Sequence, residues 1–126
     1  MIEIRKIFSI VLMLFAFNLG AINPIDPAII SYFSNANASI PASKVATSCE
    51  AFIMENSGSC NASQLNAWLK SFYVRYPLKS FLVKHELVKA GRQYLIGVYS
   101  STNNSEFRVH LLVDGNNRIE QVRIEK

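Results

Sequence analysis

One stretch, residues 61–76 (NASQLNAWLKSFYVRY), constrains the fold more than any other part of the chain. Its large apolar side chains recur at the spacing of one helix face: Leu65, Trp68, Leu69, Phe72 and Tyr76. Asn61 can cap this helix, Gln64 stands three residues later as in a capping box, and Pro77 ends the helix. Burial of each large side chain stabilises by about 1.5–3 kcal/mol, which only offsets the lost backbone entropy. The helix therefore needs a partner surface.

The rest of the chain offers that surface, because the apolar period changes to two after Pro77. Four strands are predicted, at 79–89, 92–101, 106–113 and 118–125, with short turns between them. This pattern is typical of an antiparallel meander. One face is expected to carry the helix and includes Phe81, Val83, His85 and Leu87, Tyr94, Ile96 and Val98, and Phe107, Val109, Leu111 and Val113.

The opposite face of the meander is not uniformly polar. It is interrupted by Leu82, Val88, Leu95, Tyr99 and Leu112. A partner molecule over this face, such as a second copy of the chain in a homodimer, is one explanation. A curved sheet that is partly wrapped by its own loops is the other.

Shorter elements precede the long helix. Two short helices are predicted at 27–33 and 41–46, because Asp26-Pro27 and Pro41 are typical helix starts. Residues 49–55 favour a strand, although a helical reading stays open, and residues 56–60 (NSGSC) are expected to form a loop. The order predicts an α+β fold, a cone-shaped roll whose N-terminal helices pack on a bent antiparallel sheet.

The N-terminus has the three parts of a secretory signal. Arg5 and Lys6 precede an apolar run at 7–17, and Leu19-Gly20-Ala21 offers a cleavage site before Ile22. We expect a signal peptide at 1–21, a single mature domain at 22–126, and a periplasmic or secreted protein. The run is short for a membrane span, so we expect no stable span after cleavage; an uncleaved anchor is the alternative.

The composition of the chain argues against several classes of binding partner. The formal net charge is +4 over 126 residues, without a basic run or an interleaved basic and aromatic patch, which argues against nucleic-acid binding. Only two cysteines occur, with no histidine near them, so no metal site is predicted, and no motif indicates a cofactor.

The two cysteines are candidates for a disulfide. Export would place Cys49 and Cys60 in an oxidising compartment. A straight strand from 49 to 55 would hold them farther apart than the Cα separation of about 7 Å that a disulfide allows. The bridge therefore forms only if residues 56–60 fold back, and both outcomes stay open.

A set of short segments along the second half resembles one family. They are Pro77–Phe81 (PLKSF), His85, Tyr94-Leu95-Ile96-Gly97, Phe107-Arg108-Val109 and the closing IEQVRIE at 119–125. In this order they resemble the small exported bacterial proteins catalogued as domain of unknown function 4783. The resemblance is strongest from Ser63 onward and does not include Cys49 or Cys60. It implies a nuclear transport factor 2-like, or cystatin-like, fold and an envelope location, and it brings no catalytic residues.

That resemblance implies a pocket between helix and sheet. Candidate lining residues are Trp68, Phe72, His85, Tyr94 and Arg108. Four of them have a plainer reading: Trp68 and Phe72 as helix core, His85 as a histidine at the core edge, and Arg108 as a surface charge. An isomerase in such a pocket would need a carboxylate in an apolar setting, for which Glu86 is the acid to test.

No catalytic constellation emerges from these residues. The leading hypothesis is a non-enzymatic binding module of the cell envelope, for a small ligand or a protein. The alternative is an isomerase or hydratase that uses the pocket between helix and sheet. An exported inhibitor or partner protein is a third reading, suggested only by size and export.

Overall fold

The computed structural model describes residues 25–126, so the expected signal at 1–21 lies outside the described part of the chain. Two α-helices are present in the described part, α2 (Pro27–Ser34) and α3 (Ala62–Arg75). Neither has the length and apolar character that crossing a bilayer would require.

Both helices begin at the residues that the sequence predicts. The Asp26 carboxylate caps α2 by accepting from the backbone N–H of Ala28 at 2.9 Å. The start of α3 is a complete capping box: Asn61 Oδ1 accepts from the Gln64 N–H at 2.9 Å, and Gln64 Oε1 accepts from the Asn61 N–H at 3.0 Å. These bonds satisfy N–H groups that a helix start otherwise leaves without partners.

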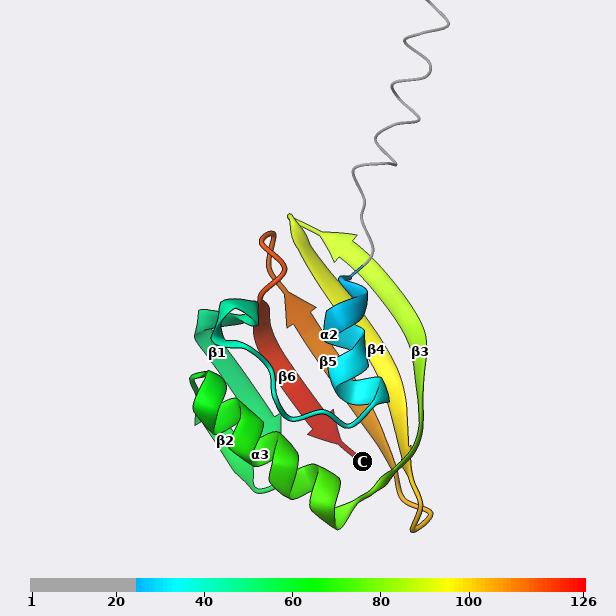
Figure 1. Ribbon diagram of the computed structural model, residues 1–126. Helices are drawn as coiled ribbons and strands as arrows, with labels where there is room; N and C mark the ends of the chain where they lie inside the picture. The colour runs from blue at the N-terminus through cyan, green and yellow to red at the C-terminus, as the bar shows by residue number, and fades with distance from the viewer. Residues whose placement is uncertain (1–24) are drawn as a thin grey trace, which may run out of the picture.

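Six strands form one sheet in the order β2-β1-β6-β5-β4-β3 (Figure 1). Their bounds are β1 (Val45–Ile53), β2 (Asn56–Ser59), β3 (Leu78–Lys89), β4 (Arg92–Ser101), β5 (Glu106–Val113) and β6 (Ile119–Glu125). The predicted meander β3-β4-β5-β6 is confirmed, and all its pairs are antiparallel. Strand β1 joins the meander by pairing parallel to β6.

Two predictions in the first half are wrong in detail. The expected loop at 56–60 begins with strand β2, which turns back antiparallel onto β1. The expected helical turn at 41–46 is a 3₁₀ turn at Ala42–Lys44, after which β1 begins at Val45. In both places the neighbouring strand supplies backbone partners that the local sequence does not reveal.

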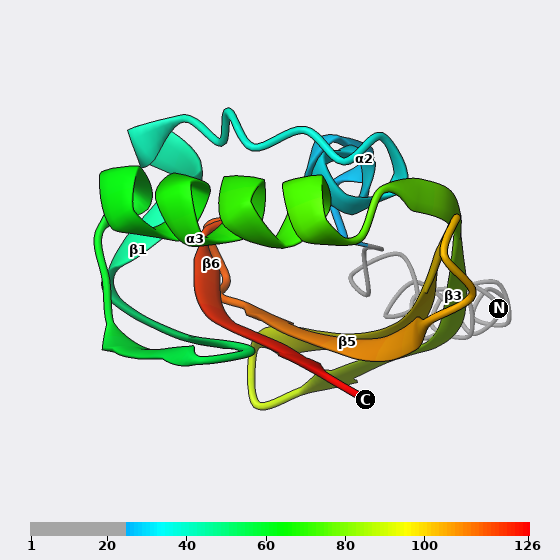
Figure 2. The same cartoon turned by 90° about the horizontal axis from the view of Figure 1, so that it is seen from below.

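Both helices lie on the same face of the strongly bent sheet (Figure 2). The core between them is formed by α2, α3 and the inner rows of β1, β4, β5 and β6. Asn66 of α3 fixes the connection between α2 and β1: its Oδ1 accepts from the Ile40 N–H at 2.8 Å, and its Nδ2 donates to the Ile40 carbonyl at 2.9 Å. The connection around Ile40 is thereby held against α3 without joining the sheet.

Bulges and a glycine shape the bend of the sheet. In the pairing of β3 with β4, Lys79 and Lys84 are each an extra residue without a partner on β4. Gly97 of β4 lies opposite Val83, beside the second bulge. A Cβ on Gly97 would come within 2.5 Å of the Phe81 ring, so glycine permits this ring to lie across β4.

The bulge at Lys84 corrects the predicted faces of β3. His85 and Leu87 were expected to share the face of Phe81, but the extra residue moves them to the opposite face, the one without helices. In β4 the two predicted faces are reversed: Leu95 and Tyr99 are buried under the helices. Both rows of β4 are apolar, so alternation separates the rows without telling which row is inside.

Candidate functional site

The space between α3 and the sheet, where a pocket was expected, is filled by aromatic side chains. Phe72 is 2% exposed and stands at the centre of this cluster. Its ring centroid lies 5.0 Å from that of Phe107, 5.1 Å from Tyr99, 5.4 Å from Tyr76 and 5.9 Å from Tyr73. Such separations are typical of packed aromatic pairs. Phe72 is thus a core residue, the plainer of its two readings.

The interior tyrosine hydroxyls are already occupied. Tyr73 donates to the Tyr32 carbonyl at 2.8 Å, and Tyr99 donates to the Tyr76 carbonyl at 2.6 Å, at the ends of the two helices. Burial raises the pKa of Tyr99 to about 12 and also raises that of Tyr73. Both are therefore neutral donors that tie helix ends to the core, and neither is free to transfer a proton.

Only a small space remains beside Trp68. A cavity of about 10 Å³ lies beside the aromatic cluster and is bordered by Ile53, Trp68 and Tyr76, among others. This volume holds one water molecule at most. The interior of the described domain therefore offers no room for a substrate at this place.

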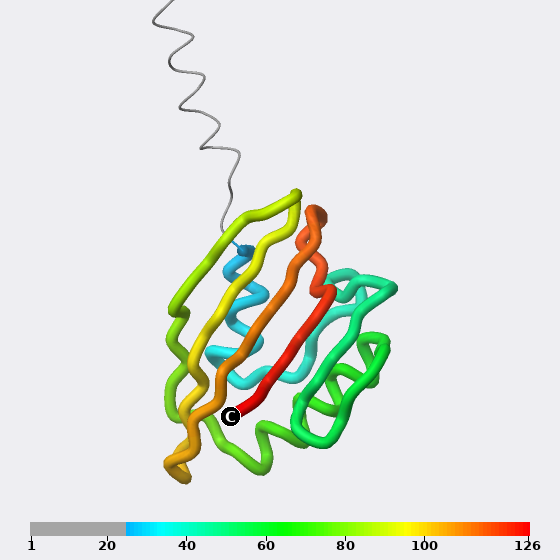
Figure 3. Tube along the Cα trace, turned by 180° about the vertical axis from the view of Figure 1, so that it is seen from behind, coloured from blue at the N-terminus to red at the C-terminus, as the bar shows by residue number. Residues whose placement is uncertain are grey.

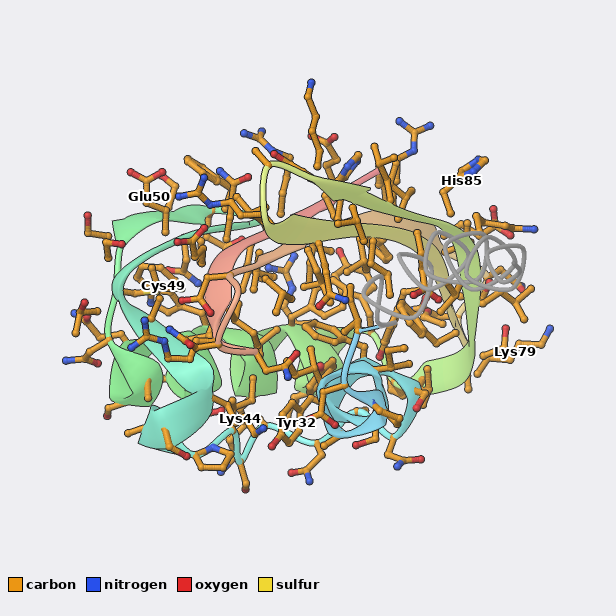
Figure 4. The ribbon with its side chains drawn as sticks, turned by 90° about the horizontal axis from the view of Figure 1, so that it is seen from above. Tyr32, Lys44, Cys49, Glu50, Lys79 and His85 are labelled. Atoms are coloured by element: carbon orange, nitrogen blue, oxygen red, sulfur yellow. The ribbon has the colours of Figure 1, made fainter. Side chains whose placement is uncertain are left out.

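The five expected pocket residues do not converge. Trp68 and Phe72 belong to the helix side of the core. His85 and Tyr94 lie on the opposite face of the sheet, and Arg108 is exposed on β5. Figure 4 shows His85 pointing away from the helices. The structure thus brings together only His85 and Tyr94 of this set.

The opposite face of the sheet is open and carries a groove, which we call the outer groove. Figure 3 shows this face, with α2 and α3 behind the sheet. The outer groove has a volume of about 720 Å³ and spans β3, β4, β5 and β6. This volume lies in the range of about 300–1,000 Å³ that is usual for small-molecule sites.

Two cross-strand rows line the outer groove. The strand register gives the first row as His85, Ile96, His110 and Arg123, and the second as Leu87, Tyr94, Leu112 and Gln121. Apolar side chains therefore occupy the middle of the groove, and polar groups stand at its β6 side. Leu112 was predicted as an apolar residue of the outer face, but Ile96, His110, Gln121 and Arg123 were not predicted as site residues, because their alignment depends on the strand register.

The charged end of the outer groove is a small cluster around Glu125. Nε2 of His110 lies 3.7 Å from Glu125 Oε2 and, though buried, has no hydrogen-bond partner among residues 25–126. Arg123 Nη1 lies 3.9 Å from Glu125 Oε1, and its guanidinium stacks over the Phe52 ring at 4.5 Å. The partly exposed Arg123 guanidinium can offer donors to a ligand beside an apolar floor.

Within residues 25–126 no group of three or more His, Cys, Asp or Glu side chains is placed to hold a metal ion. His85 and Glu86, which an isomerase would use, are both exposed on β3. His85 and Glu86 therefore do not form the enclosed pair of acid and donor that proton abstraction needs.

Comparison with known proteins places this fold in a family. The model of the family described as "Domain of unknown function (DUF4783)" matches residues 27–125. A DUF4783 family protein from Bacteroides ovatus has a crystal structure similar to this one, with a TM-score of 0.71, 21% identity, and coverage of 82% of this chain and 97% of that one. No curated protein matches the sequence.

More distant structures share the architecture alone. The protein named Rd1NTF2_04 with long sheet is 12% identical, with a TM-score of 0.57 and coverage of 71% and 85%. A SnoaL-like family protein from Agrobacterium tumefaciens is 9% identical, with a TM-score of 0.58 and coverage of 79% and 92%. The expected nuclear transport factor 2-like fold is thereby confirmed.

Proposed function

Since the chain belongs to the DUF4783 family, whose description names no activity, we propose from its geometry that it is a non-enzymatic binding module of the cell envelope. Its ligand occupies the outer groove. The observation that carries this proposal is an open groove of about 720 Å³ with an apolar middle, on a domain in which aromatic side chains fill the space between α3 and the sheet.

The exposed apolar side chains support this site. Leu87 is 58% exposed and Tyr94 37% exposed, and they are direct neighbours in one row of the groove. Covering such a row stabilises a complex by about 25 cal/mol per Å² of apolar area removed from water. Arg123 at the other side supplies donors that orient a ligand. The occupant is therefore an amphipathic molecule with an apolar body and an acceptor at one end.

The alternative of an isomerase or hydratase acting between helix and sheet has less support. Phe72 and its aromatic neighbours fill that space, and the tyrosine hydroxyls there bond to backbone carbonyls. The outer groove offers His85 and Glu86 only in exposed positions. Electrostatic stabilisation of a transition state is weak where water has free access.

A matched pair of variants on β3 tests the site. Leu87 lines the outer groove, whereas Leu82, which is similarly exposed at 55% against 58%, does not. We expect anilinonaphthalene sulfonate, an apolar fluorescent anion, to bind the wild type and Leu82→Glu alike, and to bind Leu87→Glu about tenfold more weakly. Because both variants add one carboxylate, the change in net charge is the same in both and cannot separate them. Equal losses in the two variants, or no binding to the wild type, would overturn the proposal.

Native mass spectrometry addresses the natural ligand. Wild-type protein that is purified without denaturation from its own host is expected to retain added mass, and Leu87→Glu to lose it. Expression of the full chain in a Gram-negative host tests export: the mature protein is expected in the periplasmic fraction with Ile22 as its first residue. Full-length protein in the cytosol would contradict the envelope location and leave the groove assay unaffected.

A further inference from the structure

The hairpin of β1 and β2 brings the two cysteines of the chain together. Its register pairs Glu50 with Ser59, which makes Cys49 and Cys60 the next opposed residues. The Cys60 N–H donates to the Cys49 carbonyl at 3.0 Å, and the two Sγ atoms lie 3.8 Å apart. The fold-back that a disulfide would require is therefore present.

The backbone geometry suits a bridge. Residues that face each other across a hydrogen-bonded antiparallel pair have Cα atoms about 5.5 Å apart. Disulfides span Cα separations of roughly 4.4–6.8 Å, and a spacing of about 5.5 Å lies within that range. Closing the bond requires the Sγ atoms to approach from 3.8 Å to about 2.05 Å, by side-chain rotation and a small adjustment of the two strands.

Both thiols are enclosed by the core. Cys49 is 1% and Cys60 6% exposed. Figure 4 shows Cys49 directed inward from β1, whereas Glu50 beside it points outward. Cys60 directly precedes Asn61, the cap of α3, so a bond between the cysteines would also anchor the start of that helix.

We propose that Cys49 and Cys60 form an intramolecular disulfide when the chain folds in the presence of a disulfide donor. One cysteine thiolate attacks the donor disulfide and releases one donor thiol. The second cysteine thiolate attacks the mixed disulfide and releases the other. The two cysteines lose two electrons and two protons in total, and the donor disulfide is reduced to two thiols.

The bridge must form early in folding. The thiolate is the attacking species, and burial raises the pKa of Cys49 to about 12 and also raises that of Cys60. In the folded domain, therefore, little of either cysteine is present as thiolate, and the donor has poor access to the two sulfur atoms. The same enclosure protects the finished bridge from reductants.

Refolding under two redox conditions tests the proposal. The denatured chain is refolded with glutathione disulfide or with a phosphine reductant, then unfolded and treated with iodoacetamide. With the donor, we expect an intact mass lower by two hydrogens, no alkylation, and a Tm about 10–20 °C above that of the reduced protein. Cys60→Ser serves as the control and is expected to have the same Tm under both conditions; Cys60→Ala replaces it if the serine variant does not fold.

The proposal would be overturned if refolding with the donor left both cysteines open to alkylation or yielded only disulfide-linked dimers. The early timing has its own test: donor added to folded, reduced protein is expected to close the bridge about tenfold more slowly than during refolding, and equal rates would refute it.

Discussion

Replacing Phe72 by alanine tests whether the interior is a packed core or a closed binding pocket. Phe72 is 2% exposed and contacts four aromatic rings. A buried Phe→Ala change costs about 3–5 kcal/mol, because apolar area is lost and a cavity remains. We expect the upper half of this range, since the neighbouring rings are fixed by backbone hydrogen bonds through Tyr73 and Tyr99 and cannot collapse inward.

Guanidinium unfolding followed by circular dichroism measures this cost. Phe72→Leu, expected to lose about 1–2 kcal/mol, keeps the test valid if the alanine variant does not fold. Val74→Ala is the matched control on the same helix: Val74 is 71% exposed, so its free energy of unfolding should stay within about 0.5 kcal/mol of wild type. A loss below about 1.5 kcal/mol for Phe72→Ala would refute the packed core.

Binding of a small apolar ligand gives a second test of the packed core. An apolar cavity created in a tightly packed core stays dry and binds benzene-sized molecules. Benzene should therefore raise the Tm of Phe72→Ala, because binding to the folded state alone stabilises it. The wild type should show no such rise. Equal stabilisation of both proteins would mean that the interior already holds an empty pocket, contrary to the packing described.

Three further predictions follow from single interactions. Asn66→Ala should lower the free energy of unfolding by about 1–3 kcal/mol in a urea titration, since it removes two hydrogen bonds to the backbone of Ile40; no change would refute the clamp. Gly97→Ala and Gly97→Val should both lower the Tm, because any Cβ there meets the Phe81 ring, and a wild-type Tm in both variants would contradict that contact. At Asp114, burial raises the pKa, but backbone and side-chain hydrogen bonds outweigh it and hold the pKa below 3.8. Its stabilisation is therefore full above pH 3.8 and lost as the pH falls through the lower folded-state pKa, so Asp114→Asn should remove that part of the acid dependence of the Tm.

The elements that were predicted correctly are those with local signals. Helix α3 carries its capping box, its apolar face and its terminating proline within one stretch, and the meander strands carry clear alternation. Strand β2 was missed because NSGS has no apolar alternation, and only its pairing with β1 makes it a strand. The parallel contact between β1 and β6 joins segments about 70 residues apart, and no local pattern encodes it.

The candidate site also depends on features that local sequence patterns do not encode. His85 was assigned to the inner face by alternation, and the one extra residue at Lys84 reverses that assignment for the rest of β3. Tyr94 and Leu95 are neighbours of similar apolar character, so only the position of the helices decides which of them is buried. The groove is thus a property of register and bulges, which sequence alternation alone does not provide.

The bulges also explain how the protein can leave an apolar row uncovered. Strand β3 is an edge strand that exposes Leu82 and Leu87, and such an edge invites pairing with other chains. Lysines occupy both bulge positions, Lys79 and Lys84, and thereby add charge and irregular backbone where a new strand would attach. Association through the edge is disfavoured while the face of the sheet stays open. The free energy of covering the apolar row is then available to a ligand that approaches the face, which is the arrangement that a binding module needs.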